Sequence, residues 1–186
     1  MKRALAAVLA FGLTGVLPAS AAVVEGVSFP PEYSAGGKSL ALNGVGLLRW
    51  KWVVKAYVAA LYLGSGAKPE QIFEDVPKRL EIEYFHGIEA ADFGKATLDR
   101  IRLNVSAAEF EKLRPRIDAL NAFYLDVKPG DRYALTYVPG LGTELALNGR
   151  ALGSVPGADL AGALFAIWLG KVPIDDSLKR ALLDSP

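Results

Sequence analysis

Residues 49–63, RWKWVVKAYVAALYL, are the most strand-like segment of the 186-residue sequence. The segment is rich in tryptophan, valine and tyrosine, and it lies between Gly46 on one side and Gly64-Ser65-Gly66 on the other. This composition between turn-forming residues is typical of a β-strand. A strand of this length is long enough to cross a whole sheet, so we expect the fold to be built around one large sheet.

Side-chain alternation gives the two faces of this predicted strand different chemistry. One face is apolar throughout and is expected to be core: Trp50, Trp52, Val54, Ala56, Val58, Ala60 and Tyr62. The other face begins with cations and a phenol and ends apolar: Arg49, Lys51, Val53, Lys55, Tyr57, Ala59, Leu61 and Leu63. This second face would suit a ligand with an acidic head and an apolar body, because a guanidinium binds a carboxylate through a planar fork. Alternatively, the strand simply emerges into water at its Arg49 end, and a bulge near Arg49 would invert the alternation.

The rest of the chain predicts strands first, then helices, then strands and helices again. Strands are expected at 27–29, 38–42, 78–85, 132–138 and 143–147, with a further extended segment at 150–155. Helices are expected at 89–103, from 106 towards 123, at 159–169 and at 175–183. Ser106 and Glu109 form a capping box that opens the second helix, and Pro115 should bend or divide it. This order predicts an α+β fold, an antiparallel sheet with helices packed on one face.

Two carboxylates share the outer face of the predicted strand 78–85. Leu80, Ile82 and Tyr84 alternate with Glu81 and Glu83, so both acids should point away from the core. Paired acids are compatible with general acid and base chemistry, but on an alternating strand a solvated face is the favoured interpretation.

Residues 1–21 have the order of a secretory signal peptide. Lys2 and Arg3 precede an apolar run from residue 4 to 16, and Ala19-Ser20-Ala21 provides a small-residue cleavage site. The run contains glycines and is short for a membrane span, which argues against a retained anchor. We therefore expect one domain, residues 22–186, exported to the periplasm or the extracellular space and without stable membrane insertion after cleavage.

Composition excludes several classes of site. Removing Lys2 and Arg3 from 21 basic residues leaves 19 against 20 acidic ones, a formal charge of −1 that does not favour nucleic acid as a partner. The chain has no cysteine and a single histidine, His86, so thiol chemistry, a histidine-rich zinc site and a Ser/His/Asp triad are excluded within one chain. No metal, nucleotide or other cofactor is expected.

Several motifs, in order, resemble the bacterial chalcone isomerase-like proteins. They are LNGVGLLR at 42–49, VKAYVAALYL at 54–63, KPGD at 128–131, YVPGLGT at 137–143, LNG at 147–149 and IWLG at 167–170. The resemblance extends over residues 38–183. It implies an open-faced β-sandwich, in which a large antiparallel sheet carries a layer of helices, in agreement with the order of elements.

The resemblance also implies site residues in the cleft between sheet and helices. Arg49 resembles the family arginine, and Tyr57 resembles the tyrosine that holds a carboxylate in the fatty-acid-binding branch. Phe93, Arg100 and Ile167 stand where the isomerases have a tyrosine, an asparagine and a polar residue. Phe93 and Ile167 donate no hydrogen bond, which disfavours ring closure but leaves an apolar wall intact.

The leading hypothesis is therefore non-catalytic binding of a fatty acid or similar amphipathic anion. Arg49 and Tyr57 would hold the head group, with Lys55 assisting electrostatically. The expected walls are Leu61, Phe93, Ile167 and Trp168, and Arg100 also belongs to the candidate ligand-binding set. Two alternatives stay open. One is an intramolecular lyase or isomerase acting on an enone or chalcone-type substrate through Arg49 and Tyr57. The other is a structural or interaction protein whose own side chains fill the cleft.

Overall fold

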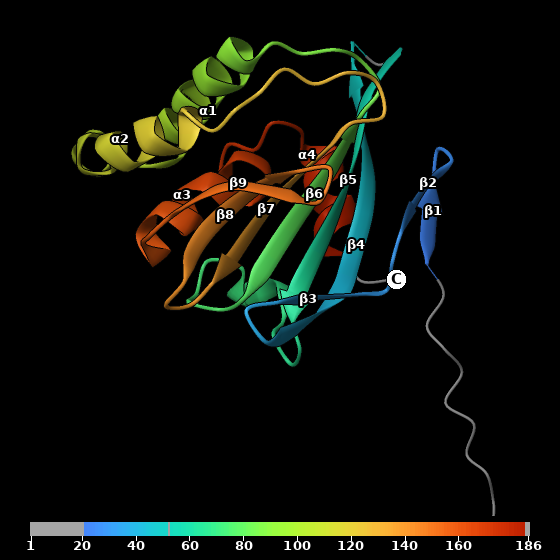
Figure 1. Ribbon diagram of the computed structural model, residues 1–186, viewed down its shortest axis with the longest axis horizontal. Coiled ribbons are helices and arrows are strands. Elements are labelled where there is room, and N and C mark those ends of the chain that lie inside the picture. Colours follow the sequence, from blue (N-terminus) through green and yellow to red (C-terminus); the bar gives the residue numbers. More distant parts are fainter. Residues whose placement is uncertain (1–20, 52, 185–186) are drawn as a thin grey trace, which may run out of the picture.

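The computed structural model describes residues 21–51 and 53–184, and the predicted signal peptide lies almost wholly outside this range. A seven-stranded antiparallel sheet with the strand order β3-β4-β5-β6-β7-β8-β9 dominates the fold (Figure 1). Its strands are β3 Glu32–Ala35, β4 Lys38–Trp50, β5 Val54–Gly64, β6 Lys78–Tyr84, β7 Arg132–Val138, β8 Gly142–Leu147 and β9 Arg150–Val155. The predicted α+β fold class, an open-faced sandwich with helices on one face, is confirmed.

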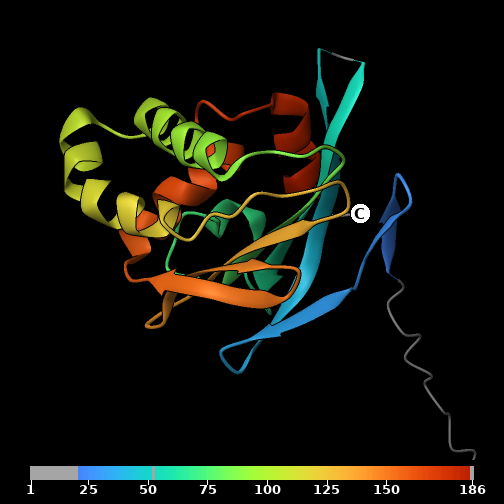
Figure 2. The same ribbon diagram turned by 45° about the horizontal axis from the view of Figure 1, so that its top comes forward.

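Four α-helices cover one face of the sheet (Figures 1 and 2). They are α1 Ala90–Asn104, α2 Ala107–Asn121, α3 Ala158–Leu169 and α4 Asp176–Leu183, and a short 3-10 helix η1, Pro69–Gln71, links β5 to β6. The predicted capping box is present, since Ser106 Oγ accepts the Glu109 N–H at 3.3 Å and Glu109 accepts the Ser106 N–H at 2.9 Å. Pro115 lies inside α2, which continues through it and is not divided. No helix in the described residues is long and apolar enough to cross a membrane.

A small hairpin, β1 Ala22–Val24 and β2 Val27–Phe29, packs on the opposite face of the sheet. Phe29, Val58 and Tyr62 are completely buried there, and the Tyr62 hydroxyl donates to the carbonyl oxygen of Pro30 at 3.1 Å. The larger core lies on the helical side, where one face of the sheet meets all four helices. The central strands are therefore buried on both faces.

The predicted single strand over residues 49–63 is wrong, because the chain reverses direction within it. β4 ends at Trp50 and β5 begins at Val54, and the Val53 N–H donates to the Trp50 carbonyl at 3.3 Å across the turn. Lys51 adopts φ 49°, a left-handed conformation that is uncommon for a residue with a side chain. The segment is thus the tip of a long hairpin, and β4 extends well beyond the predicted strand 38–42.

A β-bulge follows this turn and breaks the regular side-chain alternation expected over residues 49–63. Leu48 pairs with Tyr57 but Arg49 pairs with Lys55, so Ala56 is an extra residue. From Tyr57 onwards, the side chains at Tyr57, Ala59, Leu61 and Leu63 face the helices, and those at Val58, Ala60 and Tyr62 face the β1-β2 side. The expectation that Tyr57, Ala59 and Leu61 lie opposite the core is therefore wrong: they belong to the larger core.

The Asn43-Gly44-Val45-Gly46 sequence holds α4 against β4. A Cβ atom at Gly44 would collide with the carbonyl oxygens of Ala181 and Leu182, and one at Gly46 would lie 2.7 Å from Leu178 Cδ1. Asn43 is an extra residue in β4, and its Nδ2 donates to the Leu182 carbonyl at 2.7 Å. The glycines therefore serve close packing of a helix on a strand, which fixes one end of the helical layer.

The acidic face of β6 is not solvated, contrary to the favoured interpretation. Glu81 is 6% exposed and accepts from Arg79 at 2.6 Å and from Arg132 at 2.7 Å. Arg132 also pairs with Glu83 at 2.5 Å. The aromatic rings of Tyr33 and Phe29 lie over the guanidinium groups of Arg79 and Arg132, at 3.8 and 4.9 Å. These carboxylates are ion-paired parts of the β1-β2 side of the sheet, away from the helical cleft.

Candidate functional site

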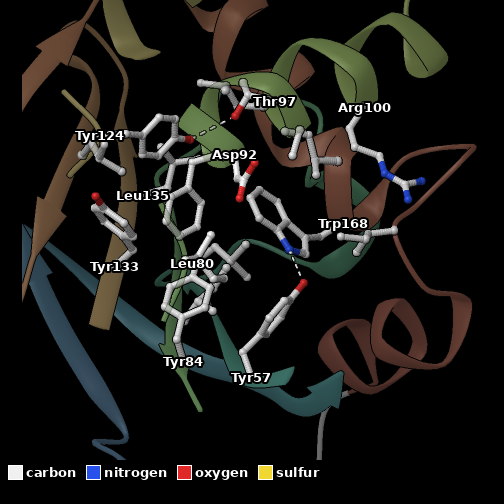
Figure 3. A pocket seen from close by; sticks show the side chains of 18 residues that line it. Tyr57, Leu80, Tyr84, Asp92, Thr97, Arg100, Tyr124, Tyr133, Leu135 and Trp168 are labelled. Carbon is white, nitrogen blue, oxygen red and sulfur yellow. Dashed lines mark hydrogen bonds between the residues drawn. The ribbon is translucent and has the colours of Figure 1, made fainter. Parts of the chain in front are cut away.

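A cavity of about 250 Å³ lies between the sheet and the helices (Figure 3). One water molecule needs only about 10–15 Å³ measured in the same way, so this space is far larger than a packing defect. Most of its wall is apolar: Leu80, Ile82, Ile88, Phe93, Ala96, Leu135, Leu145, Leu164, Ile167 and Ile174. Strands β5 to β8 form its floor, and helices α1 and α3 contribute to its roof.

Tyr57 and Trp168 form a hydrogen-bonded pair in the cavity wall. Trp168 Nε1 donates to the Tyr57 hydroxyl oxygen at 2.9 Å (Figure 3). The indole N–H can only donate, so the Tyr57 O–H keeps its own hydrogen for another acceptor. Burial raises the pKa of Tyr57, and the Asp175 charge raises it further, whereas the Trp168 hydrogen bond and the Arg100 charge oppose this only in part. Tyr57 is therefore a neutral donor at physiological pH.

Tyr84 presents a second hydroxyl to the cavity. Its ring is packed edge-on against those of Tyr57, Phe93 and Tyr133 at centroid distances of 5.7, 5.4 and 6.2 Å. The side chain is 5% exposed, and within the described residues its hydroxyl makes no hydrogen bond. Burial raises the pKa of Tyr84 as well. Because Tyr84 lines the cavity and its hydroxyl has no protein partner there, the hydroxyl is available to a polar atom of a ligand.

The other two cavity tyrosines have partners in the protein. Tyr124 and Thr97 share a hydrogen bond of 3.1 Å between their hydroxyls. The Tyr133 hydroxyl donates to the Leu125 carbonyl at 2.9 Å and accepts the Leu125 N–H at 2.7 Å. These bonds hold the two tyrosine rings of the wall in place. Phe93 is held with them, because it stacks on Tyr124 with ring centroids 5.3 Å apart.

The mouth of the cavity lies along α1. Asp92, Ala96 and Arg100 line both the cavity and a shallow hollow on the outer surface. Their spacing of four residues places them on one side of the helix. Arg100 is half-buried, and no ion pair or hydrogen bond of its guanidinium occurs within residues 21–51 and 53–184. Figure 3 shows its side chain extending from α1 along the rim, on the same side as Trp168.

The structure brings together five of the sequence-predicted site residues: Tyr57, Phe93, Arg100, Ile167 and Trp168 all line the cavity. Leu61 lies on the same face of β5 as Tyr57 but is completely buried in the core, away from the cavity wall.

Arg49 and Lys55 lie outside the cavity. Arg49 pairs with Glu25, in the turn between β1 and β2, at 3.4 Å, and Lys55 pairs with the same carboxylate. The extra residue Ala56 turns these cations to the β1-β2 side, so the structure does not bring Arg49 and Lys55 together with Tyr57 as a head-group site.

Sequence reasoning missed the mouth and the aromatic wall. Helical spacing from Arg100 indicates that Asp92 and Ala96 lie on the same side of the helix, so the sequence does contain a signal for the mouth. Alternation places Tyr84 on the core face of its strand, which is correct, but alternation does not distinguish a cavity wall from packed core. Tyr124 follows α2 in a segment without regular periodicity. Within the described residues, no group of three or more potential metal-ligating side chains occurs.

Comparison with known proteins gives a family and a fold. A family model described as chalcone isomerase-like matches residues 21–184. No curated protein sequence matches the chain. Among solved structures, a fatty-acid binding protein of Arabidopsis thaliana superposes with a TM-score of 0.69 at 16% sequence identity, covering 89% of this chain and 96% of the other. At this identity the likeness shows a shared fold, whereas the family match spans nearly all of the described chain. The resemblance of the motifs is thus confirmed, and the chain belongs to the chalcone isomerase-like family.

Proposed function

We propose that the protein binds a fatty acid or a similar amphipathic carboxylate in this cavity without transforming it. One observation carries the proposal: the half-buried Arg100 stands without a partner in the described structure, at the rim of a cavity whose wall is mostly apolar. A cation in this position favours an anionic ligand head, and the apolar wall favours an acyl body.

The cavity wall supports an acyl chain. Ile82, Leu135 and Ile167 are among its side chains, and they come from two strands and a helix that pack around the space. Each methylene transferred from water to such a wall contributes about 0.8 kcal/mol. The Tyr84 hydroxyl adds one polar atom inside the cavity, which would favour a chain with a hydroxyl, a keto group or another polar substituent.

Arg100 and Tyr57 are the proposed partners of the head group. Arg100 lines the same cavity as Tyr57, and the charges of Asp175 and Arg100 act on the pKa of Tyr57 in opposite directions. The Tyr57 O–H can donate to a ligand, because its oxygen accepts from Trp168. Asp92 would repel a carboxylate, but it precedes Arg100 by two helical turns, roughly 12 Å along the axis. The head group is therefore placed at the Arg100 end of the mouth. In this proposal Arg100 binds the carboxylate head group, which is the role that the family resemblance suggested for Arg49.

The Arabidopsis fatty-acid binding protein supports this assignment as a precedent for the fold. The alternative is an isomerase acting on an enone, and one observation favours it. Tyr57 and Tyr84 are buried neutral hydroxyls, the kind of donor that stabilises a developing oxyanion. Conversion of a chalcone-type substrate by the purified protein, lost in Tyr57→Phe, would establish that alternative over simple binding.

The test compares the ligand carried by three arginine variants: Arg100→Gln, Arg102→Gln and Arg49→Gln. The protein is purified natively and denatured, and the released small molecules are identified by mass spectrometry. Affinity for a fluorescent fatty acid is then measured by titration. Arg100→Gln should weaken binding by about tenfold or more, because a charge-assisted hydrogen bond contributes about 1.5–3 kcal/mol.

Arg102→Gln is the matched control, since Arg102 lies on the same helix, pairs with Asp99 at 3.9 Å and lines neither the cavity nor the outer hollow. Arg49→Gln should also retain full affinity, because Arg49 pairs with Glu25 outside the cavity. Equal affinity in Arg100→Gln and Arg102→Gln would refute the head-group assignment. A loss confined to Arg49→Gln would favour the hairpin as the binding site instead.

Export is part of the same proposal. Residues 1–21 would direct the chain across the membrane and be removed, so that the carrier acts outside the cytoplasm. The N-terminal sequence of the protein recovered from its cells should then begin at Ala22. A chain that starts at Met1 or Lys2 would overturn this proposal.

A further inference from the structure

The tip of the β4-β5 hairpin exposes large apolar side chains beyond the body of the protein. Trp50 is 60% exposed, Val53 is 80% exposed and Val54 is 39% exposed. Figure 2 shows the ends of both strands projecting past the helical layer. Neighbouring positions of the same hairpin are completely buried once the strands enter the sheet, as at Val58 and Ala60. Within the β4-β5 hairpin, the exposed large apolar side chains are therefore concentrated at the tip.

Cations surround these apolar side chains. Arg49, Lys51 and Lys55 lie within the tip, and Lys51 Nζ stands 4.4 Å from the centroid of the Trp50 ring. The only acidic group paired with them in the described residues is Glu25, which contacts Arg49 and Lys55. Three cations and one carboxylate give the tip a local formal charge of +2, although the whole chain has a formal charge of only +1.

We infer that this tip docks on the surface of an anionic lipid bilayer. Tryptophan is favoured at the level of lipid head groups, because its ring is apolar and its N–H is polar. Lysine and arginine beside it are attracted by the negative surface potential of anionic lipids. A protein partner would have to cover both the apolar side chains and the cations, whereas an anionic bilayer provides both complements in one surface.

The docked orientation would bring the cavity close to the membrane. Tyr57 lines the cavity and follows Val54 by three residues of the same strand, roughly 10 Å. Membrane docking is independent of the proposed ligand, since it requires only the tip residues. If both hold, the hairpin positions the cavity for exchange of an amphipathic ligand with the bilayer.

Vesicle flotation tests the inference directly. The purified protein is mixed with vesicles of phosphatidylcholine alone or of phosphatidylcholine and anionic phosphatidylglycerol in equal parts, because an anionic surface attracts lysine and arginine. Binding is expected only to the anionic vesicles and should fall as salt is raised, because the attraction is screened. Trp50→Ser and Lys51→Ser should each reduce partitioning by about fivefold.

Two variants elsewhere on the surface serve as matched controls. Leu141→Ser removes a 65% exposed apolar side chain from the β7-β8 turn, and Lys38→Ser removes an exposed cation from the other end of β4. Both should bind vesicles as the unchanged protein does, and circular dichroism verifies that all four variants are folded. Absence of binding to anionic vesicles, or equal loss in the tip variants and the controls, would overturn the inference. The ligand-release measurement is separate from flotation, so failure of docking and failure of the proposed function are distinguishable.

Discussion

A tryptophan at position 96 should close the cavity without disturbing the fold. Ala96 is exposed on α1 and lines both the cavity and the outer hollow, between Asp92 and Arg100. A large side chain there has open space on both sides of the mouth and displaces no packed residue. Ala96→Trp therefore competes with the ligand for the mouth and leaves the core side chains in place.

The expected loss of ligand affinity follows from the area of apolar ligand surface that the indole would displace. A tryptophan side chain buries about 150–250 Å², and about half of that would lie over the mouth. Displacing about 100 Å² of apolar ligand surface costs about 2.5 kcal/mol, which is roughly a sixtyfold loss of affinity. The cost to α1 itself is small, about 0.5 kcal/mol of helix propensity.

Ala91→Trp is the matched control, because Ala91 is exposed on the same helix and does not line the cavity. Fluorescent fatty acid titration should show the loss only in Ala96→Trp, and urea unfolding should show both variants within about 1 kcal/mol of the unchanged protein. Equal fatty-acid affinity of the two tryptophan variants would refute the assignment of the mouth to this side of α1. A large loss of stability in Ala96→Trp alone would refute the claim that the space there is open.

Two further predictions concern the support of the helical layer. Asn43→Ala removes the buried donor to the Leu182 carbonyl and should lower the free energy of unfolding by about 1–3 kcal/mol, measured by urea denaturation; no change would show that α4 does not depend on this bond. The Arg116 hydrogen bond lowers the pKa of Asp159 from 3.8 to about 2, so the stability it contributes is complete above about pH 4 and is lost as pH falls through 2. Because both groups are partly exposed, Asp159→Asn should cost only about 0.5–1 kcal/mol at pH 7, and the difference should vanish below pH 2 in acid-unfolding curves followed by circular dichroism. A difference that persists at pH 1.5, or that grows with acid, would contradict this assignment.

Much of the fold was predictable because its local signals agree with its packing. The capping box at Ser106 marks the start of α2, and Gly170 marks the end of α3. The turns at Pro139-Gly140-Leu141-Gly142 and Asn148-Gly149 separate β7, β8 and β9 as expected. At each of these helix ends and turns, the residues present have the hydrogen-bonding or conformational property that the position requires.

The hairpin tip was not predictable in the same way. Lys51 takes the left-handed conformation at the turn, but the Trp50 to Val53 sequence has strong strand propensity and no glycine, asparagine or proline. The turn forms because residues on both sides pair in register across the sheet, from Leu40 with Gly64 to Trp50 with Val54. Long-range strand pairing thus overrides the local preference of these residues for an extended strand. This pairing cannot be recognised from neighbouring residues in the sequence.

The position of the cation proposed to bind the ligand depends on a single inserted residue. With regular alternation, Arg49, Lys55 and Tyr57 would share one face of the hairpin, and the head group would lie beside Arg49. With Ala56 inserted, Tyr57 keeps its place under the helices while the two cations before it turn to the opposite side and pair with Glu25. A positive charge in the cavity wall must then come from another element, and Arg100 on α1 is the cation that lines the cavity. The same insertion leaves Arg49 and Lys55 beside Trp50 at the tip, so one bulge separates the residues proposed to hold the ligand from those proposed to contact the membrane.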